Sequence, residues 1–171
     1  MARSPRHRRR TAAGFLAGFI AVVACGACAS ERDDAPMVDR IDDAIFAVES
    51  FYEAPQDFVE ISATASVVSL IVDVDGGAEQ AFWSRDDGLV EPIPIELVDR
   101  PTFRSGDLDL RPDRVLDQLR EELPDSEIID FAITGAGDGV VVYDARLQSE
   151  RGGVLLVLLD GDGRILGAQG Q

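Results

Sequence analysis

Close pairs of aspartates are the residues of this chain whose types and spacing could do chemistry. Two carboxylates that face one another can cleave a glycosidic bond or hold a metal ion. Most of the pairs adjoin glycine, however, and aspartate beside glycine commonly forms a turn by bonding to its own backbone. We therefore expect turns and no catalytic site at the four pairs, which are Asp73/Asp75, Asp86/Asp87, Asp107/Asp109 and Asp160/Asp162.

Two residue types that many enzyme mechanisms need are missing from the chain after its basic head. His7 is the only histidine, and lysine is absent altogether. Without them there is no imidazole base, no histidine-ligated zinc, no Schiff base and no phosphate-binding lysine. The sequence therefore predicts a protein that is not an enzyme and that has no cofactor.

The stretch from Asp160 to Gly163 has the spacing with which a calcium-binding loop begins. Such a loop needs further oxygen ligands and a glutamate at its twelfth position, where this chain has Gln171. The neighbouring apolar segments have the pattern of strands rather than helices. The prediction is therefore a hairpin turn without a metal ion.

The N-terminus has the order of regions that is typical of a secretory signal. Arginines crowd residues 1–10, and an uncharged apolar run follows over 11–24. This run is shorter than the roughly 20 residues that a membrane-spanning helix needs, and it has the length of a signal segment. Residues 1–24 are therefore predicted to be a signal peptide.

The end of the signal resembles a lipobox, at which a cysteine receives diacylglycerol. Val22 and Ala24 supply the aliphatic and the small residue that precede Cys25. We expect lipidation at Cys25, with Cys28 as the alternative site and a secretory signal cut near Ala29 as the alternative processing. Lipidation would place the protein at the cell membrane, anchored on its extracytoplasmic side.

Residues 25–36 then form a flexible tether, because they are small, polar or charged and have no periodic apolar residues. Residues 37–171 remain as a single domain, which is long enough for a hydrophobic core. Both cysteines lie ahead of this domain, so no disulfide can stabilise it.

The chain is strongly acidic. It has 32 aspartates and glutamates against 16 basic residues, and its formal net charge is −16. Removal of the five head arginines would make the mature chain more acidic still. Nucleic acid is therefore excluded as a partner, because its binding depends on basic residues that neutralise phosphates. The charge is compatible with a basic protein partner and also with a role in solubility alone.

Two amphipathic helices are predicted in the domain. Met37–Ala54 places Val38, Ile41, Ile45 and Val48 three or four residues apart, which gives one apolar stripe. The second helix covers 111–123. Pro112 and Asp113 suit the first turn of this helix.

Extended segments bounded by glycine-rich turns follow each predicted helix. The apolar stretch Val154–Leu159 predicts a central strand covered on both faces. Pro92 and Pro94 predict that the segment around them lies at a sheet edge. The segments after the first helix are 58–65, 67–75, 79–85 and 89–98, and those after the second are 127–134, 140–148, 154–159 and 164–168.

The second helix, the hairpin over 140–159 and the closing Asp-Gly turn before Arg164 resemble exported PepSY-like and β-lactamase-inhibitor-like domains. The resemblance covers about residues 38–169 and implies an α+β fold. In it, two helices pack on an extended antiparallel sheet. The repeated order of a helix followed by strands, with Asp39-Arg40-Ile41 placed like Asp113-Arg114-Val115, indicates two similar α-β halves over about 37–99 and 110–171. Members of these families are mostly inhibitory or regulatory binding proteins, so no active site is implied.

The function that follows is a non-enzymatic binding role for one sheet face, with a protein or peptide as partner. Candidate interface residues are Trp83 and Tyr143, since aromatic residues often anchor interfaces, and Arg146, which could bind an anionic group. The alternative for the two aromatic residues is a place in the core. The alternative function is a carrier of a lipid or small apolar ligand, which needs an enclosed cavity lined by Val, Leu and Phe.

Overall fold

The structure is a computed structural model that describes residues 35–75, 77–97 and 100–170. The predicted signal peptide, Cys25, Cys28 and most of the predicted tether lie outside the described residues. None of the helices in the described part of the chain has the length and apolar character that crossing a membrane requires.

The first half of the described chain has a helical segment followed by four strands. The helices are the 3-10 turn η1 (Val38–Arg40) and α1 (Ile41–Tyr52). The α1 helix ends where Glu53 adopts a left-handed φ of 55°, two residues before Pro55. The four strands are β1 (Asp57–Ala63), β2 (Val68–Val74), β3 (Gly77–Ser84) and β4 (Gly88–Ile95).

The second half has the same order of elements. A 3-10 turn, η2 (Ser105–Asp107), precedes the helix α2 (Pro112–Glu122), which begins with Pro112 in its first turn as predicted. Four strands follow, which are β5 (Ser126–Gly137), β6 (Val140–Ser149), β7 (Val154–Leu159) and β8 (Ile165–Gly170).

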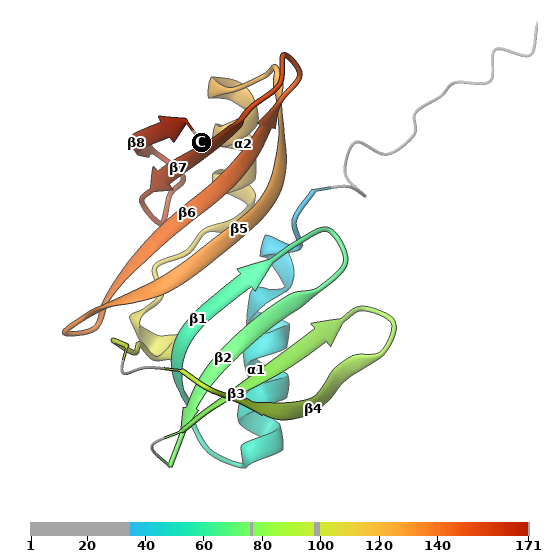
Figure 1. The fold of residues 1–171 in the computed structure, drawn as a ribbon, viewed down its shortest axis with the longest axis vertical. Helices are drawn as coiled ribbons and strands as arrows, with labels where there is room; N and C mark the ends of the chain where they lie inside the picture. The colour runs from blue at the N-terminus through green and yellow to red at the C-terminus, as the bar shows by residue number, and fades with distance from the viewer. Residues whose placement is uncertain (1–34, 76, 98–99, 171) are drawn as a thin grey trace, which may run out of the picture.

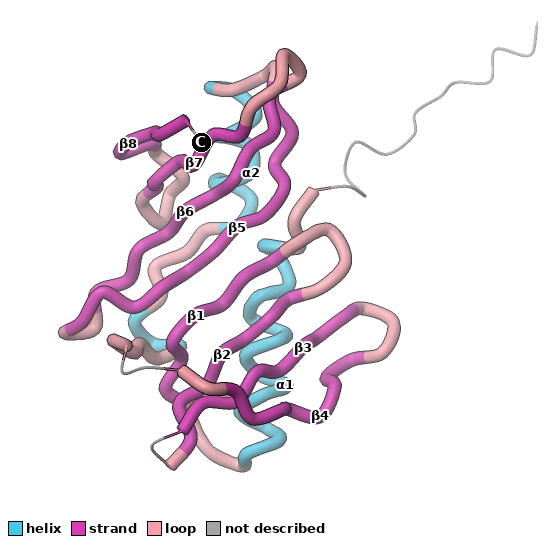
Figure 2. The backbone as a smooth tube through the Cα atoms, in the orientation of Figure 1, coloured by secondary structure: helices cyan, strands magenta, loops and turns pink. Residues whose placement is uncertain are grey.

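All eight strands belong to one antiparallel sheet in the order β4-β3-β2-β1-β5-β6-β7-β8. The two sets of strands join where Glu60–Ala63 of β1 pair with Phe131–Thr134 of β5. Both helices lie on one side of this sheet, α1 beside β1–β4 and α2 beside β5–β8 (Figure 1, Figure 2). The α+β class with two helices on an extended antiparallel sheet is therefore confirmed.

One hydrophobic core runs between the helices and the sheet. The predicted stripe of α1 is buried in it, with Ile41, Ile45 and Val48 at most 5% exposed. From α2, the residues Val115 and Leu119 are fully buried. Every second residue of the central strands completes the core. In β6 these are Tyr143, Ala145 and Leu147, as the alternation of the sequence predicts.

Two β-bulges change which strand residues face the core. In β1 the register shifts between Phe58 and Glu60, so Phe58 joins Ile61 on the helix side. Val59, which simple alternation placed beside Ile61, is the extra residue. In β5 the shift lies between Ile128 and Asp130. A bulge inserts one residue and so reverses the alternation beyond it, which turns Asp130 away from the core.

The prediction that Val154–Leu159 is a central strand covered on both faces is wrong. It forms β7, which is next to the outermost strand β8. Val157 and Leu159 are buried on the helix side, whereas Leu158 on the other side is 43% exposed. The continuous apolar run therefore reflects one core face and one uncovered apolar face.

The segment between the two halves pairs with the start of β1. Phe103 and Phe58 exchange backbone hydrogen bonds of 2.8 and 2.9 Å, and their rings lie 6.0 Å apart. Gly135 lies close to this segment, because a Cβ there would be 2.5 Å from the carbonyl oxygen of Pro101. The absence of a side chain at Gly135 thus allows the segment to pass.

The Asp160–Gly163 stretch is a hairpin turn, as predicted. The Asp160 carboxylate accepts hydrogen bonds from the backbone N–H groups of Asp162 and Arg164. Gly161 accepts a 2.9 Å backbone hydrogen bond from Arg111 at the start of α2. A Cβ at Gly161 would lie 1.6 Å from the carbonyl oxygen of Asp109, so the turn packs directly on the segment that leads into α2.

Candidate functional site: the uncovered face of the sheet

The face of the sheet opposite the helices has no covering layer among the described residues. We call it the open face. Its residues follow from the register, since directly paired residues of an antiparallel sheet point to the same side. One row across all eight strands consists of Val90, Phe82, Ser69, Ser62, Ala132, Asp144, Leu158 and Gly167.

A charged cluster lies near the middle of the open face. Arg146 of β6 donates hydrogen bonds to Asp130 of β5, from Nε at 2.6 Å and from one terminal nitrogen. Asp130 is only 6% exposed, and it is the only buried charged side chain among the described residues. Burial of a carboxylate is costly unless it is paired, so Arg146 is the group that makes this position tolerable for Asp130.

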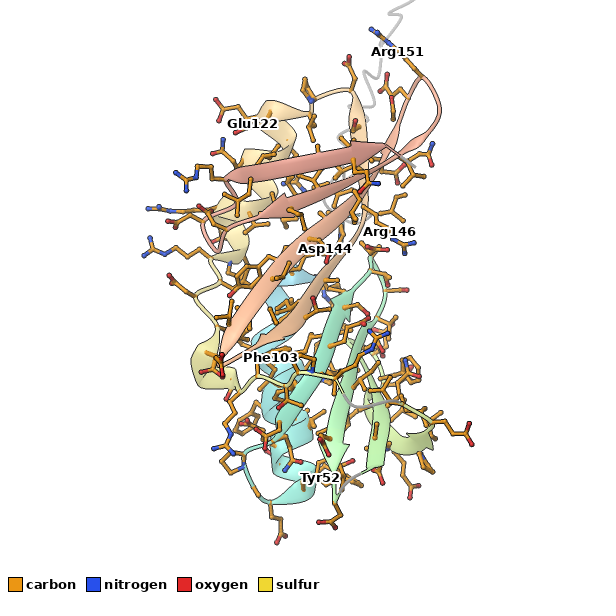
Figure 3. All side chains as sticks on the ribbon, turned by 60° about the vertical axis from the view of Figure 1, so that its left-hand side comes forward. Tyr52, Phe103, Glu122, Asp144, Arg146 and Arg151 are labelled. Atoms are coloured by element: carbon orange, nitrogen blue, oxygen red, sulfur yellow. The ribbon has the colours of Figure 1, made fainter. Side chains whose placement is uncertain are left out.

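Asp144 completes the cluster from the next open-face position of β6 (Figure 3). Partial burial raises the pKa of its carboxyl, and the negative charges of Asp130 and Glu60 raise it further against the opposing effect of Arg146. Three carboxylates thus face one arginine. The cluster is a site of negative potential that a cation from outside would relieve.

Apolar side chains flank the charged cluster on both sides. Toward β4 lie Val90 and Ile93, each 51% exposed, beside the half-buried Phe82. Toward β8 lie Leu156 and Leu158. The uncovered side of an antiparallel sheet is usually polar, and contiguous exposed apolar residues commonly mark an interaction surface.

Of the three predicted interface residues, only Arg146 lies on the open face. Trp83 and Tyr143 point to the helix side and are 9% and 5% exposed, so the prediction of an interface role does not hold for them. Arg40 lies 5.8 Å from the ring of Trp83. Tyr143 stacks on Phe131, and its hydroxyl accepts a 3.0 Å hydrogen bond from the backbone N–H of Asp109.

The paired aspartates singled out in the sequence do not form a site. Asp87 and Asp107 accept hydrogen bonds from side-chain or backbone groups three residues away, as in turns. Asp162 binds Arg111 and Arg114. In the part of the chain that the structure describes, no group of histidine, cysteine or acidic residues could hold a metal ion.

An open hollow of about 550 Å³ lies beside the end of α2, where the start of β5 pairs with the end of β6. Mostly polar and charged residues line it, so it is not the enclosed apolar cavity that a carrier of lipid would need. Ala35, where the described chain begins, is among the lining residues, with Arg120, Pro124, Ser126, Glu127, Ile128, Gln148, Ser149 and Glu150.

Comparison with known proteins gives no family for this chain. No protein-family model matches it, and no curated protein matches it. Two solved structures are similar over 75% of this chain and 87% of their own, at 12% identity. One is a DUF2874 family protein from Bacteroides uniformis ATCC 8492, with a TM-score of 0.34. The other, from Bacteroides eggerthii DSM 20697, is described as a putative periplasmic protein and has a TM-score of 0.33. Likeness at this level says nothing about the function of this chain.

Proposed function

We propose that this protein is a lipid-anchored component of the cell envelope whose open face binds another protein. The observation that carries the proposal is the open face itself, where exposed Val90, Ile93 and Leu158 surround a charged cluster. Burial of such apolar residues by a partner would be favourable, and the charges would orient it. The anchor is inferred from Val22–Cys25 in the sequence.

The charge of the chain favours a partner with a basic surface. Residues 37–99 contain two arginines and 15 acidic residues, whereas residues 100–171 contain eight arginines and 14 acidic residues. A basic partner would therefore be attracted most strongly toward the β1–β4 end of the open face. Long-range attraction of this kind speeds association and is screened by salt.

A duplicated origin of the two halves is part of the proposal. Each half has a helix followed by four antiparallel strands, and the strand order mirrors about the β1–β5 junction. The two halves would then offer two related surfaces joined at the charged cluster. A single partner could contact both apolar patches at once.

Photo-crosslinking in the native envelope tests the binding role. A photoreactive amino acid is placed at Val90 or at Leu158 on the open face, and in control variants at Phe46, which is 73% exposed on α1. We expect the same adduct from both open-face positions and not from Phe46. Adducts from Phe46 alone, or none from the open face, would contradict the proposal. Slower association at raised salt would support a basic partner, and an unchanged rate would exclude that part.

The anchor has a separate test. Replacement of Cys25 by alanine should move the protein from the membrane fraction to the soluble fraction and abolish labelling with radioactive palmitate, whereas Cys28→Ala should do neither. If Cys28→Ala lost the labelling and Cys25→Ala kept it, the lipid would be assigned to Cys28.

A further inference from the structure

The two outermost strands of the sheet differ in how their edges are protected. The β4 strand has Pro92 and Pro94, and a register shift interrupts the pairing of each outermost strand with its neighbour. Proline, charge and bulges prevent an edge from pairing with a further strand. The β8 strand, Ile165–Gly170, contains neither proline nor a charged residue. Within the described residues it pairs with β7 only, so its outer backbone groups are available.

The layer between α2 and the sheet stops short of β8. Ala168 pairs with the buried Val157, and Gly170 pairs with Leu155, so both small residues face the helix side, where both are exposed. Ile165, at the start of β8, and Leu116 of α2 are only partly buried. Large apolar side chains placed beside Ala168 and Gly170 would therefore cover these residues and extend the core.

Arginines gather at the end of β8 where the strand begins. Arg111, Arg114 and Arg164 have side chains that are 54%, 63% and 75% exposed. Asp160 and Asp162 pair with them, and Asp109 and Asp113 belong to the same stretch of the chain as Arg111 and Arg114. Arg164 is the most exposed of the three and directly precedes Ile165, the first residue of β8, so an acidic group placed beside it would gain a favourable charge contact.

We propose that the outer edge of β8 binds an extended segment of a partner protein, which adds to the sheet as a further strand. The segment has large apolar residues at alternate positions that face α2, and an acidic residue beside Arg164. Backbone hydrogen bonds to β8 supply affinity, and the alternating side chains supply specificity. This site lies on the sheet edge and does not depend on binding at the open face.

A second copy of this chain fits the edge less well. Two β8 strands paired with each other would bring Ala168 and Gly170 of both copies to the helix side. These residues are too small to cover Leu116 and Ile165. They would leave a gap between the two α2 helices, so the space calls for larger side chains from a different sequence.

The test uses the full chain in detergent micelles and a short blocked peptide in which valine alternates with threonine, with glutamate at both ends. A peptide of the same composition in scrambled order is the control. Fluorescence anisotropy measures affinity, and hydrogen–deuterium exchange locates the bound peptide. We expect binding of the alternating peptide alone, with slower exchange confined to β8 and the start of α2.

Matched variants decide which side of the edge matters. Ala168→Lys puts a charge on the α2 side, where added apolar residues would lie, and should weaken binding by about tenfold or more. Gln169→Lys adds the same charge on the open-face side and should change affinity by less than about threefold. Both positions are exposed, so both variants should melt as the parent does.

Three results would overturn the proposal. One is no saturable binding of the alternating peptide, and another is slower exchange that falls on strands other than β8. The third is protection of β8 that grows with protein concentration and without peptide, which would assign the edge to a second copy. Equal weakening by the two lysine variants would reject the role of the α2 side.

Discussion

Helix α1 buries Ile41, Ala44, Ile45 and Val48 against the sheet, whereas the fully buried residues of α2 are Val115 and Leu119. The two helices have nearly the same length, so the difference lies in the width of their apolar stripes. A wide stripe covers more of the sheet over β1–β4, and a narrow one leaves Leu116 of α2 and Ile165 of β8 partly buried. The same arrangement of elements can therefore give one closed half and one half that is open at its edge.

Loops compensate for the narrow stripe in the second half. The Asp160–Gly163 turn packs on the segment before α2 and bonds to Arg111. Asp162 of this turn pairs with Arg111 and Arg114. The second half thus depends on close backbone packing around glycine, whereas the first half depends on side chains of α1.

The largest expected effect is the loss of a buried side chain from either helix, which should show whether α2 is held less firmly than α1. Leu119→Ala should lower the free energy of unfolding by about 3 kcal/mol, since it removes a fully buried side chain and leaves a cavity. Ile41→Ala should cost a similar amount. Hydrogen–deuterium exchange should distinguish the two variants. Because Val115 is the only other fully buried residue of α2, the amides of α2 should lose protection first in Leu119→Ala. Equal protection of α2 in both variants would show that the two halves are equally closed.

A methyl group at Gly161 tests the dependence of the second half on its turn. Gly161→Ala should cost about 2 kcal/mol, because the new Cβ would lie 1.6 Å from the carbonyl oxygen of Asp109 and the backbone must shift. Gly167→Ala is the control, since its Cβ would meet nothing within 4 Å. Urea denaturation measures both variants. A loss as small in Gly161→Ala as in Gly167→Ala would mean that the turn does not hold α2.

The sequence predicts the helices and strands well because their signals are local. The alternation of Val141, Tyr143, Ala145 and Leu147 depends on their own strand, and the two prolines place β4 at an edge wherever the other strands lie. The order of strands in the sheet is a different matter. Val154–Leu159 is apolar on both faces whether it is central or next to the edge, so composition alone could not place β7.

The charged cluster was not predictable for a related reason. Glu60, Asp130 and Asp144 come from three strands, and only the pairing of β1 with β5 and of β5 with β6 brings them together. Simple alternation puts Asp130 on the same side as Ile128, and the bulge at Ile129 reverses this. No feature of the sequence marks that bulge. Asp130 and Asp144 each stand alone in their own strand, so their spacing along the chain gives no sign that they meet.

Two tyrosines offer a comparison of polar groups in the two halves. The Tyr52 hydroxyl donates a 2.5 Å hydrogen bond to Glu79, whereas the Tyr143 hydroxyl accepts a bond from the exposed Asp109 backbone. Tyr52→Phe should cost about 1.5 kcal/mol and Tyr143→Phe about 1 kcal/mol, because a bond to a charged group is stronger. Equal losses in urea denaturation would show that the charge of Glu79 adds nothing.

The same tyrosines should make the protein sensitive to alkali. Burial raises the pKa of both hydroxyls, and at Tyr52 the hydrogen bond and charge of Glu79 raise the pKa further. The folded state keeps these protons longer than the unfolded state, so their contribution is full below about pH 10 and is lost as the pH rises above it. Tyr52→Phe should therefore lose less stability than the parent between about pH 8 and about pH 11. A parallel loss in both proteins would exclude Tyr52 as the cause.

Two aspartates should respond to pH with opposite signs. Burial, Asp130 and Glu60 raise the pKa of Asp144, so its charged form opposes folding at neutral pH. The Arg104 hydrogen bond lowers the pKa of Asp57, so its charged form favours folding. Asp144→Asn should raise the free energy of unfolding at neutral pH by less than about 1 kcal/mol, whereas Asp57→Asn should lower it by a similarly small amount, since solvent screens both sites.

Both effects should vanish in acid, each over its own range. The penalty from Asp144 disappears as the pH falls through its raised pKa, because the carboxyl becomes neutral in the folded state first. The benefit from Asp57 is present above the ordinary pKa of 3.8 and is lost as the pH falls through the lowered value. Urea denaturation from about pH 7 to about pH 3 should therefore show Asp144→Asn converging on the parent at a higher pH than Asp57→Asn. If Asp144→Asn also lost stability at neutral pH, the charge of Asp144 would stabilise the folded protein. The cluster on the open face would then not be a site of excess negative charge that a basic partner relieves.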